Sequence, residues 1–268
     1  MSRKTNKNMS ENFKMIAKTF YGFEDILSEE LLALGAQKIN KGNRNVSFYG
    51  DKGFLYKSNL SLRTALKILK PVCEFRFKDI NEYYDNIYRF EWEDYIDPTS
   101  SFLINSVVFH SNVFNNSKFT SLKAKDAIVD RFRDKFKKRP SINSFNPELR
   151  IEIHVNRNTC TISLDSSGES LHKRGYKKYN SAAPLNEVLA AGIVLMSKWD
   201  KKSDLLDPMC GTGTFLIEAA MIAKNIAPNL NRLSFAFEKW KDWDNELFEI
   251  IEESVRSKEI DFDYKLYG

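Results

Sequence analysis

The stretch Asp207-Pro208-Met209-Cys210-Gly211-Thr212-Gly213-Thr214-Phe215 decides the fold of this chain. A short apolar strand is expected just before it, over residues 204–206, and an apolar helix over residues 214–223. Glycine allows a tight turn and the close approach of a ligand to the backbone. Free N–H groups at the start of a helix favour an anion. The stretch therefore predicts a nucleotide-binding turn in an α/β domain.

Two other nucleotide-binding loops do not fit these residues. The dinucleotide-binding pattern of dehydrogenases needs a third glycine where Leu216 stands. The phosphate-binding loop of nucleoside triphosphatases needs Gly-Lys followed by Ser or Thr, and the sequence contains no such run. A glycine turn that serves only packing is the remaining alternative, and the flanking Asp207, Pro208 and Thr214 make it less favourable.

Toward the N-terminus, hydrophobic spacing predicts a small α/β lobe. We expect strands over residues 13–17 and 45–49, and helices over residues 22–34 and 54–69. Pro71 is expected to end the second helix, because proline cannot continue a helix. The resulting order is β-α-β-α.

A second lobe is predicted between the first lobe and the glycine turn. Its first strand is expected over residues 101–109, followed by a helix over residues 120–138 that Thr120 caps. Strict alternation of apolar and polar residues then predicts a β-hairpin with strands over residues 151–155 and 160–164.

The residues around the glycine turn predict three more elements. A helix is expected over residues 184–199, an acidic helix over residues 245–255 and a strand over residues 264–267. The apolar face of the first of these helices is expected to contain Leu185, Val188, Leu189, Ile193 and Met196.

Composition narrows the class of protein. The 268 residues carry a formal net charge of +5, and no apolar run is long enough to predict a transmembrane helix. Residues 1–12 are polar and do not resemble a secretion signal. The three cysteines lie far apart, which indicates a reduced cytoplasmic protein without a cysteine metal site. His110 and His154 have no acidic or cysteine neighbours at ligand spacing, so no metal site is expected and both are interpreted as structural.

Three stretches resemble one family of enzymes. The stretch 207–215 resembles motif I of methyltransferases that modify exocyclic amines of nucleic-acid bases. Residues 163–176 resemble the linker of THUMP-domain rRNA guanine-N2 methyltransferases, and residues 183–191 resemble the helix labelled motif X in that family, whose members are often named adenine-specific DNA methylases. The two front lobes resemble the family's ferredoxin-like and THUMP modules in pattern.

The resemblance implies an α/β fold with an RNA-binding front and a doubly wound, Rossmann-like methyltransferase domain. It implies a ferredoxin-like lobe over 13–70, a THUMP domain over 71–165, a linker over 166–180 and a partial methyltransferase domain over 181–268. The implied cofactor is S-adenosyl-L-methionine, and the implied cofactor-binding residues are Pro184, Glu187, Asp207, Pro208, Met209, Cys210, Gly211, Thr212, Gly213 and Thr214. Glu187 could instead simply favour the first turn of its helix.

Basic residues suggest where RNA binds. Lys and Arg outnumber Asp and Glu between residues 110 and 180. With the resemblance, RNA contact is the favoured interpretation for Lys118, Lys123, Lys125, Arg133, Lys173, Arg174 and Tyr176. The alternatives are a solvated helix face for the first four residues and an ordered linker with packed tyrosines for the last three.

One departure from the family concerns catalysis. The family carries an Asn/Asp-Pro-Pro-aromatic motif that holds the target amine, and no Pro-Pro occurs in this sequence. The residues after Thr214 are also too few for a complete doubly wound sheet. We therefore expect a truncated chain without catalytic residues. The hypotheses are an rRNA base-amine methyltransferase, a noncatalytic RNA-binding protein with a vestigial cofactor turn, and a DNA adenine methyltransferase, which the THUMP-like module disfavours.

Overall fold

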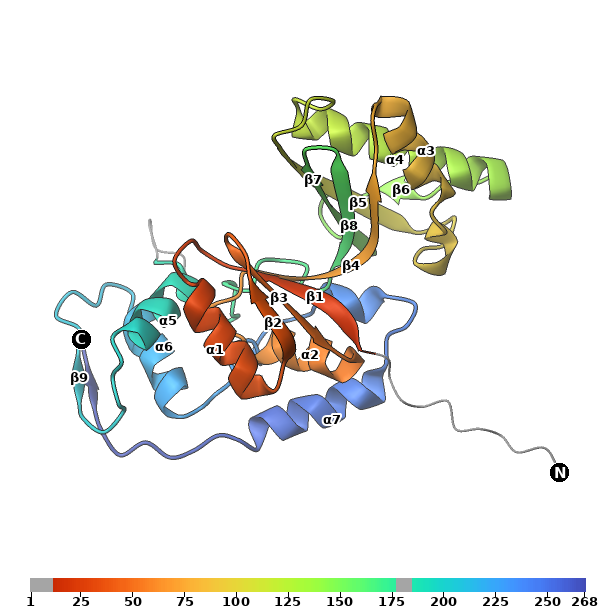
Figure 1. Cartoon of the computed structure of the whole chain (residues 1–268). Helices are drawn as coiled ribbons and strands as arrows, with labels where there is room; N and C mark the ends of the chain where they lie inside the picture. Colours follow the sequence, from red (N-terminus) through yellow and green to blue (C-terminus); the bar gives the residue numbers. More distant parts are fainter. Residues whose placement is uncertain (1–11, 177–184) are drawn as a thin grey trace.

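The computed structural model describes residues 12–176 and 185–268 (Figure 1). Two lobes share one eight-stranded sheet with the strand order β2-β3-β1-β4-β8-β7-β5-β6. A third unit, built of helices and a two-stranded parallel sheet, packs beside the first lobe. No helix of the described ranges is both long and apolar enough to cross a membrane.

The first lobe has the ferredoxin-like order β-α-β-β-α-β. Its elements are β1 (Phe13–Lys18), α1 (Glu24–Leu34), β2 (Gln37–Lys41), β3 (Asn45–Gly50), α2 (Lys52–Ser61) and β4 (Lys67–Arg76). Gly35 ends α1 with a φ of 98°, a left-handed conformation that glycine adopts without a steric penalty. The side chain of Asp51 accepts a hydrogen bond from the Phe54 N–H and caps α2.

Two expectations for this lobe were wrong. The helix expected over residues 54–69 ends at Ser61, and β4 follows it with Pro71 inside the strand. Pro71 is tolerated because the pairing of β4 with β8 shifts register between Pro71 and Cys73, and a bulge does not need every ladder N–H. The strand β2 was missed because its residues are mostly exposed and polar, so they lack an apolar alternation.

The long strand β4 joins the two lobes. Its first residues pair with β1, where Leu69 lies opposite Ile16, and its remaining length pairs with β8, where Arg76 lies opposite Thr159. The same backbone therefore belongs to the sheets of both lobes.

The second lobe places its helices on one face of the sheet. Its elements are α3 (Ile80–Arg89), the 3-10 turn η1 (Trp92–Asp94), β5 (Ser101–Phe109), α4 (Ser117–Phe136), β6 (Ser141–Ile142), β7 (Leu149–Asn156) and β8 (Thr159–Asp165). The expected hairpin is confirmed as β7 and β8.

The helices of this lobe differ from the expectation. The N-cap of α4 is Asn116 rather than Thr120, which lies buried one turn inside the helix. The helix α3 was not predicted, although Ile80, Tyr83 and Ile87 have helical spacing.

The third unit surrounds the glycine turn. It contains α5 (Glu187–Met196), β9 (Leu205–Leu206), α6 (Thr214–Ala223), the 3-10 turn η2 (Ala236–Lys239), α7 (Asn245–Arg256) and β10 (Leu266–Tyr267), and α7 packs along α2 (Figure 1). The apolar face expected for α5 is partly wrong, because Ile193 and Met196 are exposed. The buried side includes Gly192, and a Cβ built there would lie 2.1 Å from the Phe23 ring, so a small residue is needed for this contact.

Candidate functional site

The glycine turn lies between β9 and α6, as the sequence predicts. Gly211 and Gly213 have φ angles of 53° and 71°, where residues with a side chain are strained. The Gly213 N–H donates to the Cys210 carbonyl over 2.7 Å and closes the turn. Gly213 is also the N-cap of α6 and provides no side chain to cap it.

The turn offers polar groups that would favour an anionic or polar ligand. The start of α6 carries the partial positive charge of the helix dipole. Oδ1 of Asp207 accepts a hydrogen bond from the Met209 N–H over 3.1 Å. Oδ2 of the same carboxylate is buried and has no hydrogen-bond partner within the described ranges. A buried carboxylate oxygen without a partner is costly, so a donor from a ligand would be favourable here.

The backbone of the turn has open space at both glycines. A Cβ added at Gly213 would meet nothing within 4 Å, and one at Gly211 would meet only the Met209 carbonyl oxygen at 4.0 Å. Met209 itself is 90% exposed. The residues of the turn therefore leave its backbone accessible. Cys210 is half-buried, with no described partner that would activate its thiol.

The first residue of α5, Glu187, is buried beside the linker. It lies close enough to Tyr176 to raise the pKa of that phenol, although burial and Glu218 contribute more. Pro184, the other residue expected in this region, lies outside the described residues. Glu187 thus belongs to the polar contacts of the linker with the third unit.

Two of the three linker residues expected to bind RNA, Arg174 and Tyr176, are instead part of a buried ion-pair network. The Arg174 guanidinium is completely buried and donates to Glu218 of α6 over 3.1 Å. The Tyr176 hydroxyl donates to the same carboxylate over 2.9 Å. The expected RNA role of Arg174 was therefore wrong, because its donors are used inside the protein. The interpretation of an ordered, packed linker describes these residues better.

The network extends into the first lobe. Arg174 also donates to the Arg63 carbonyl over 2.7 Å, and Arg63 donates to the Ile226 carbonyl just beyond α6. Burial lowers the pKa of Arg63 to about 10 and raises the pKa of the Glu218 carboxyl. The first lobe, the linker and the helix of the glycine turn are therefore held together by the same charged groups.

The basic residues expected to contact RNA on α4 differ in their surroundings. Lys125 pairs with Asp126 over 2.7 Å, and Arg133 pairs with Asp130 over 2.8 Å. Lys118 is exposed, and the Lys123 ammonium lies 5.9 Å from the Phe119 ring centre. Neither lysine forms an ion pair with a described carboxylate. Lys173 is exposed and pairs with Glu169 over 3.0 Å.

Sequence reasoning missed a second polar region, between the two front lobes. It contains His110, His154, Arg44 and Arg157, which line two cavities that share His110. The sequence signal for this region is the polar turn Asn156-Arg157-Asn158-Thr159, which joins the two strands of the predicted hairpin. Among the described residues, no group of three or more His, Cys, Asp or Glu side chains could hold a metal ion.

Three family models match successive parts of the chain. The RlmL ferredoxin-like domain matches residues 14–69, the THUMP domain matches residues 77–165, and the RMKL-like methyltransferase domain matches residues 174–268. The three matches follow the order expected from the linker and the glycine turn.

Individual relatives are similar to this chain over most of its length. A protein of Cellvibrio japonicus named ribosomal RNA large subunit methyltransferase K/L is 40% identical over 241 residues, covering 88% of this chain and 32% of the relative. A protein of Synechocystis sp., named as a candidate RNA methyltransferase, is 36% identical over 90% of this chain and 62% of its own length. This chain therefore spans less than two thirds of these relatives.

A solved structure has the same fold. A protein described as a candidate methyltransferase, crystallised with SAH, superposes with a TM-score of 0.82 and 33% identity. The match covers 95% of this chain and 67% of the solved one.

Proposed function

Because this chain belongs to the THUMP-domain methyltransferase family, with an RlmL-type ferredoxin-like domain and an RMKL-like methyltransferase domain, we propose that it acts in the S-adenosylmethionine-dependent methylation of RNA. The proposed target is the exocyclic amine of a guanine in large-subunit rRNA, which would place the protein in the cytoplasm. The observation that carries the proposal is the open glycine turn between β9 and α6.

The residues of the turn would hold the cofactor. The first N–H groups of α6 face the position of an anion, such as the carboxylate of a methionine group. Asp207 has a buried oxygen that can accept a hydrogen bond from the ligand. When bound, the cofactor supplies a methyl group from its sulfonium. The full set of proposed cofactor-binding residues is Pro184, Glu187, Asp207, Pro208, Met209, Cys210, Gly211, Thr212, Gly213 and Thr214.

The remainder of the chain would position the RNA. The mechanism needs the base amine to meet the sulfonium in line, so catalysis depends mainly on orientation. On α4, Lys118 and Lys123 are the cations best placed for phosphates, because Lys125 and Arg133 already pair with carboxylates. Lys173 remains a proposed contact on the linker.

The group that holds the amine is proposed to lie outside these 268 residues, since they contain no Pro-Pro. Two assays separate this proposal from its alternatives. Calorimetry with S-adenosylhomocysteine should show binding by the 268-residue chain. Methyl transfer to undermethylated large-subunit rRNA, followed with a radiolabel, should be undetectable with this chain.

The outcomes discriminate among the hypotheses. RNA binding without cofactor binding would identify a noncatalytic RNA-binding protein. Transfer to duplex DNA and not to rRNA would favour an adenine-specific DNA enzyme. Transfer to rRNA by the 268 residues would place the amine-holding group among them and overturn that part of the proposal.

A further inference from the structure

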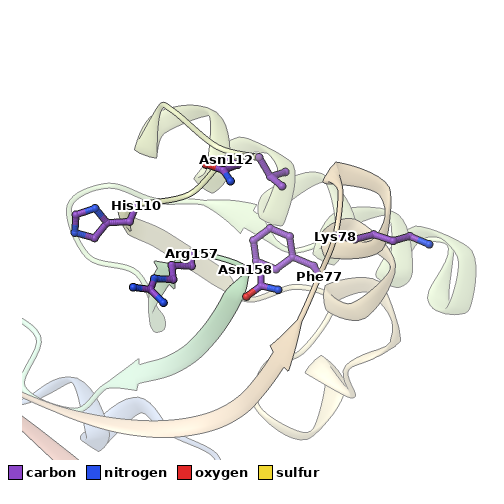
Figure 2. Close-up of a pocket in the computed structure, with 7 residues that line it drawn as sticks. Phe77, Lys78, His110, Asn112, Arg157 and Asn158 are labelled. Atoms are coloured by element: carbon purple, nitrogen blue, oxygen red, sulfur yellow. The ribbon is translucent and has the colours of Figure 1, made fainter.

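Two cavities that share the lining residue His110 extend from the space between the front lobes along the second lobe. The larger, of about 730 Å³, lies between the first lobe and the second, and it is lined by Lys18, Thr19, Asn43, Arg44, Asn45, Leu66, Val107, Phe109, His110, His154 and Asn156. The smaller, of about 410 Å³, continues it past His110 to Arg157, and Lys78 borders it from another side (Figure 2). We call the combined cavity the inter-lobe groove. Each of the two cavities taken separately has a volume within the range of ligand sites.

The groove is basic. Lys18, Arg44, Lys78 and Arg157 line it together with two histidines, and no Asp or Glu is among its lining residues. In the described ranges, no ion pair links Lys18, Arg44 or Arg157 to a carboxylate. These cations are therefore available to a ligand with negative charge.

A neighbouring carboxylate, Glu152, does not cancel this charge. Glu152 attracts Lys18, but the Glu152 carboxylate already accepts hydrogen bonds from Lys67 over 2.8 Å and from Asn105 over 3.1 Å. On the opposite wall, Glu24 accepts a hydrogen bond from the Arg44 backbone and leaves the guanidinium unpaired. A phosphate would meet cations from both lobes.

An apolar platform lies among these cations. Val107 and Phe109 of β5 are 44% and 49% exposed, on the sheet face opposite α4. The His154 ring of β7 lies 5.5 Å from the Phe109 ring, and burial lowers the pKa of His154. Exposed apolar side chains with an adjacent aromatic ring are suited to the face of a nucleobase.

The backbone of the groove is strained at three positions. Arg44, His110 and Arg157 have φ angles of 55°, 49° and 55°, which are unfavourable for residues other than glycine and, to a lesser degree, asparagine. Each lies in a turn at the end of a strand, and each borders the groove. Strain of this kind gathers at functional sites, where the side chain is needed for another purpose.

We propose that the inter-lobe groove binds single-stranded RNA, with a base stacked on Phe109 and phosphates held by Arg44 and Arg157. The inference rests on the proposed RNA substrate and locates its contact. Phosphates account for the unpaired cations, and a base accounts for the exposed aromatic ring. The strand must be single, because a base in a duplex is stacked on its neighbours and cannot offer its face to Phe109.

The test uses the full 268-residue chain and measures binding to a short single-stranded RNA and to the same strand in a duplex, across salt concentrations. Arg157→Asn should weaken single-strand binding about tenfold and reduce the salt slope by about one, since one phosphate contact is lost. Phe109→Ala should weaken it roughly tenfold without changing the slope, since stacking is not ionic.

A matched control lies outside the groove. Lys137 is also a cation with a positive φ, 57°, at the end of α4. Lys137→Asn likewise removes one positive charge and introduces the same residue at a positive φ, and it should leave affinity and salt slope unchanged. Circular dichroism and thermal melting of each variant separate loss of binding from loss of folding.

The possible outcomes test three separate parts of the proposal: the site, the stacked base and the RNA substrate. If the wild-type chain binds RNA and the groove variants bind as well as the Lys137 variant does, the groove is not the site, while RNA binding stands. If duplex binds as well as single strand, and Phe109→Ala has no effect, the stacked base is excluded. If the wild-type chain binds no RNA, the proposed RNA substrate fails and this inference fails with it.

Discussion

The backbone N–H of Arg157 donates a hydrogen bond to the carbonyl oxygen of Phe109 over 2.9 Å. This contact ties the turn of the β7–β8 hairpin to the end of β5, so the position of the cation depends on the position of the ring. The two side chains line adjoining parts of the inter-lobe groove. A ligand that uses both would find them already arranged.

The stability of an Arg157→Asn variant tests whether this arginine serves the fold. A left-handed conformation costs an ordinary residue about 1–2 kcal/mol, and asparagine tolerates it better. The free energy of unfolding should therefore stay the same or rise by up to about 1 kcal/mol. Urea denaturation measures it, and a clear loss of stability would assign Arg157 a packing role.

The buried pair of Arg174 and Glu218 should be essential for stability. Glu218→Gln leaves the guanidinium without a charged partner in a buried site, which costs about 3–5 kcal/mol. As a control, Glu252→Gln removes the exposed pair with Arg256 and should cost about 0.5 kcal/mol or less. Chemical denaturation of both variants checks the difference, and equal losses would contradict it.

The glycine turn should tolerate some side chains and not others. Gly213→Val places a β-branched residue at a φ of 71° and should abolish binding of S-adenosylhomocysteine by distorting the turn. Gly213→Asn can keep that φ, and its added side chain enters open space. Calorimetry should then show weakened but measurable binding if the space is used by the cofactor. Unchanged affinity in both variants would remove the turn from the site.

Acid should lower the folding stability of the second lobe, because it protonates Glu93. Hydrogen bonds from Arg131 hold the pKa of the Glu93 carboxyl at about 2, below its ordinary value of 4.5. A depressed carboxyl pKa stabilises the folded state above the unfolded value, and this contribution is lost as the pH falls from about 4.5 toward 2. Glu93→Gln should be less stable at neutral pH and should lose less stability over that range, as acid titration of unfolding would show.

The basic residues of α4 should not contribute equally to RNA binding. Lys123→Glu should reduce affinity and salt dependence more than Arg133→Glu, because Arg133 is already paired with Asp130. Filter binding at several salt concentrations compares the two variants. Equal effects would mean that α4 attracts RNA through its overall charge, without a specific contact at Lys123.

The glycine turn and its helix could be predicted from the sequence because the signals there are local. Glycines, an apolar strand and an apolar helix occur within a few residues of one another, and α6 begins at Thr214 as expected. The front hairpin was predictable for the same reason. The failure at residues 54–69 has the opposite cause, because β4 is a strand only through its partners β1 and β8, which are distant in sequence.

The tertiary contacts of the candidate site residues were harder to predict from the sequence. Arg174 looked like an RNA contact because the linker alternates cations and aromatic residues, but its partner Glu218 lies 44 positions further along the chain. His110 and His154 were interpreted as structural because neither has a ligand neighbour in sequence. The fold brings them to one groove with Arg44, and only the tertiary structure joins residues so far apart.

The continuity of β4 has a consequence for the spacing of the two proposed sites. The same strand pairs with β1 at one end and with β8 at the other, so the two lobes are joined by continuous backbone within one sheet. The first lobe is in turn fixed to α6 through Arg63 and Arg174. If the inter-lobe groove binds RNA as proposed, the separation between the groove and the glycine turn would determine which nucleotide of the bound strand can reach the turn.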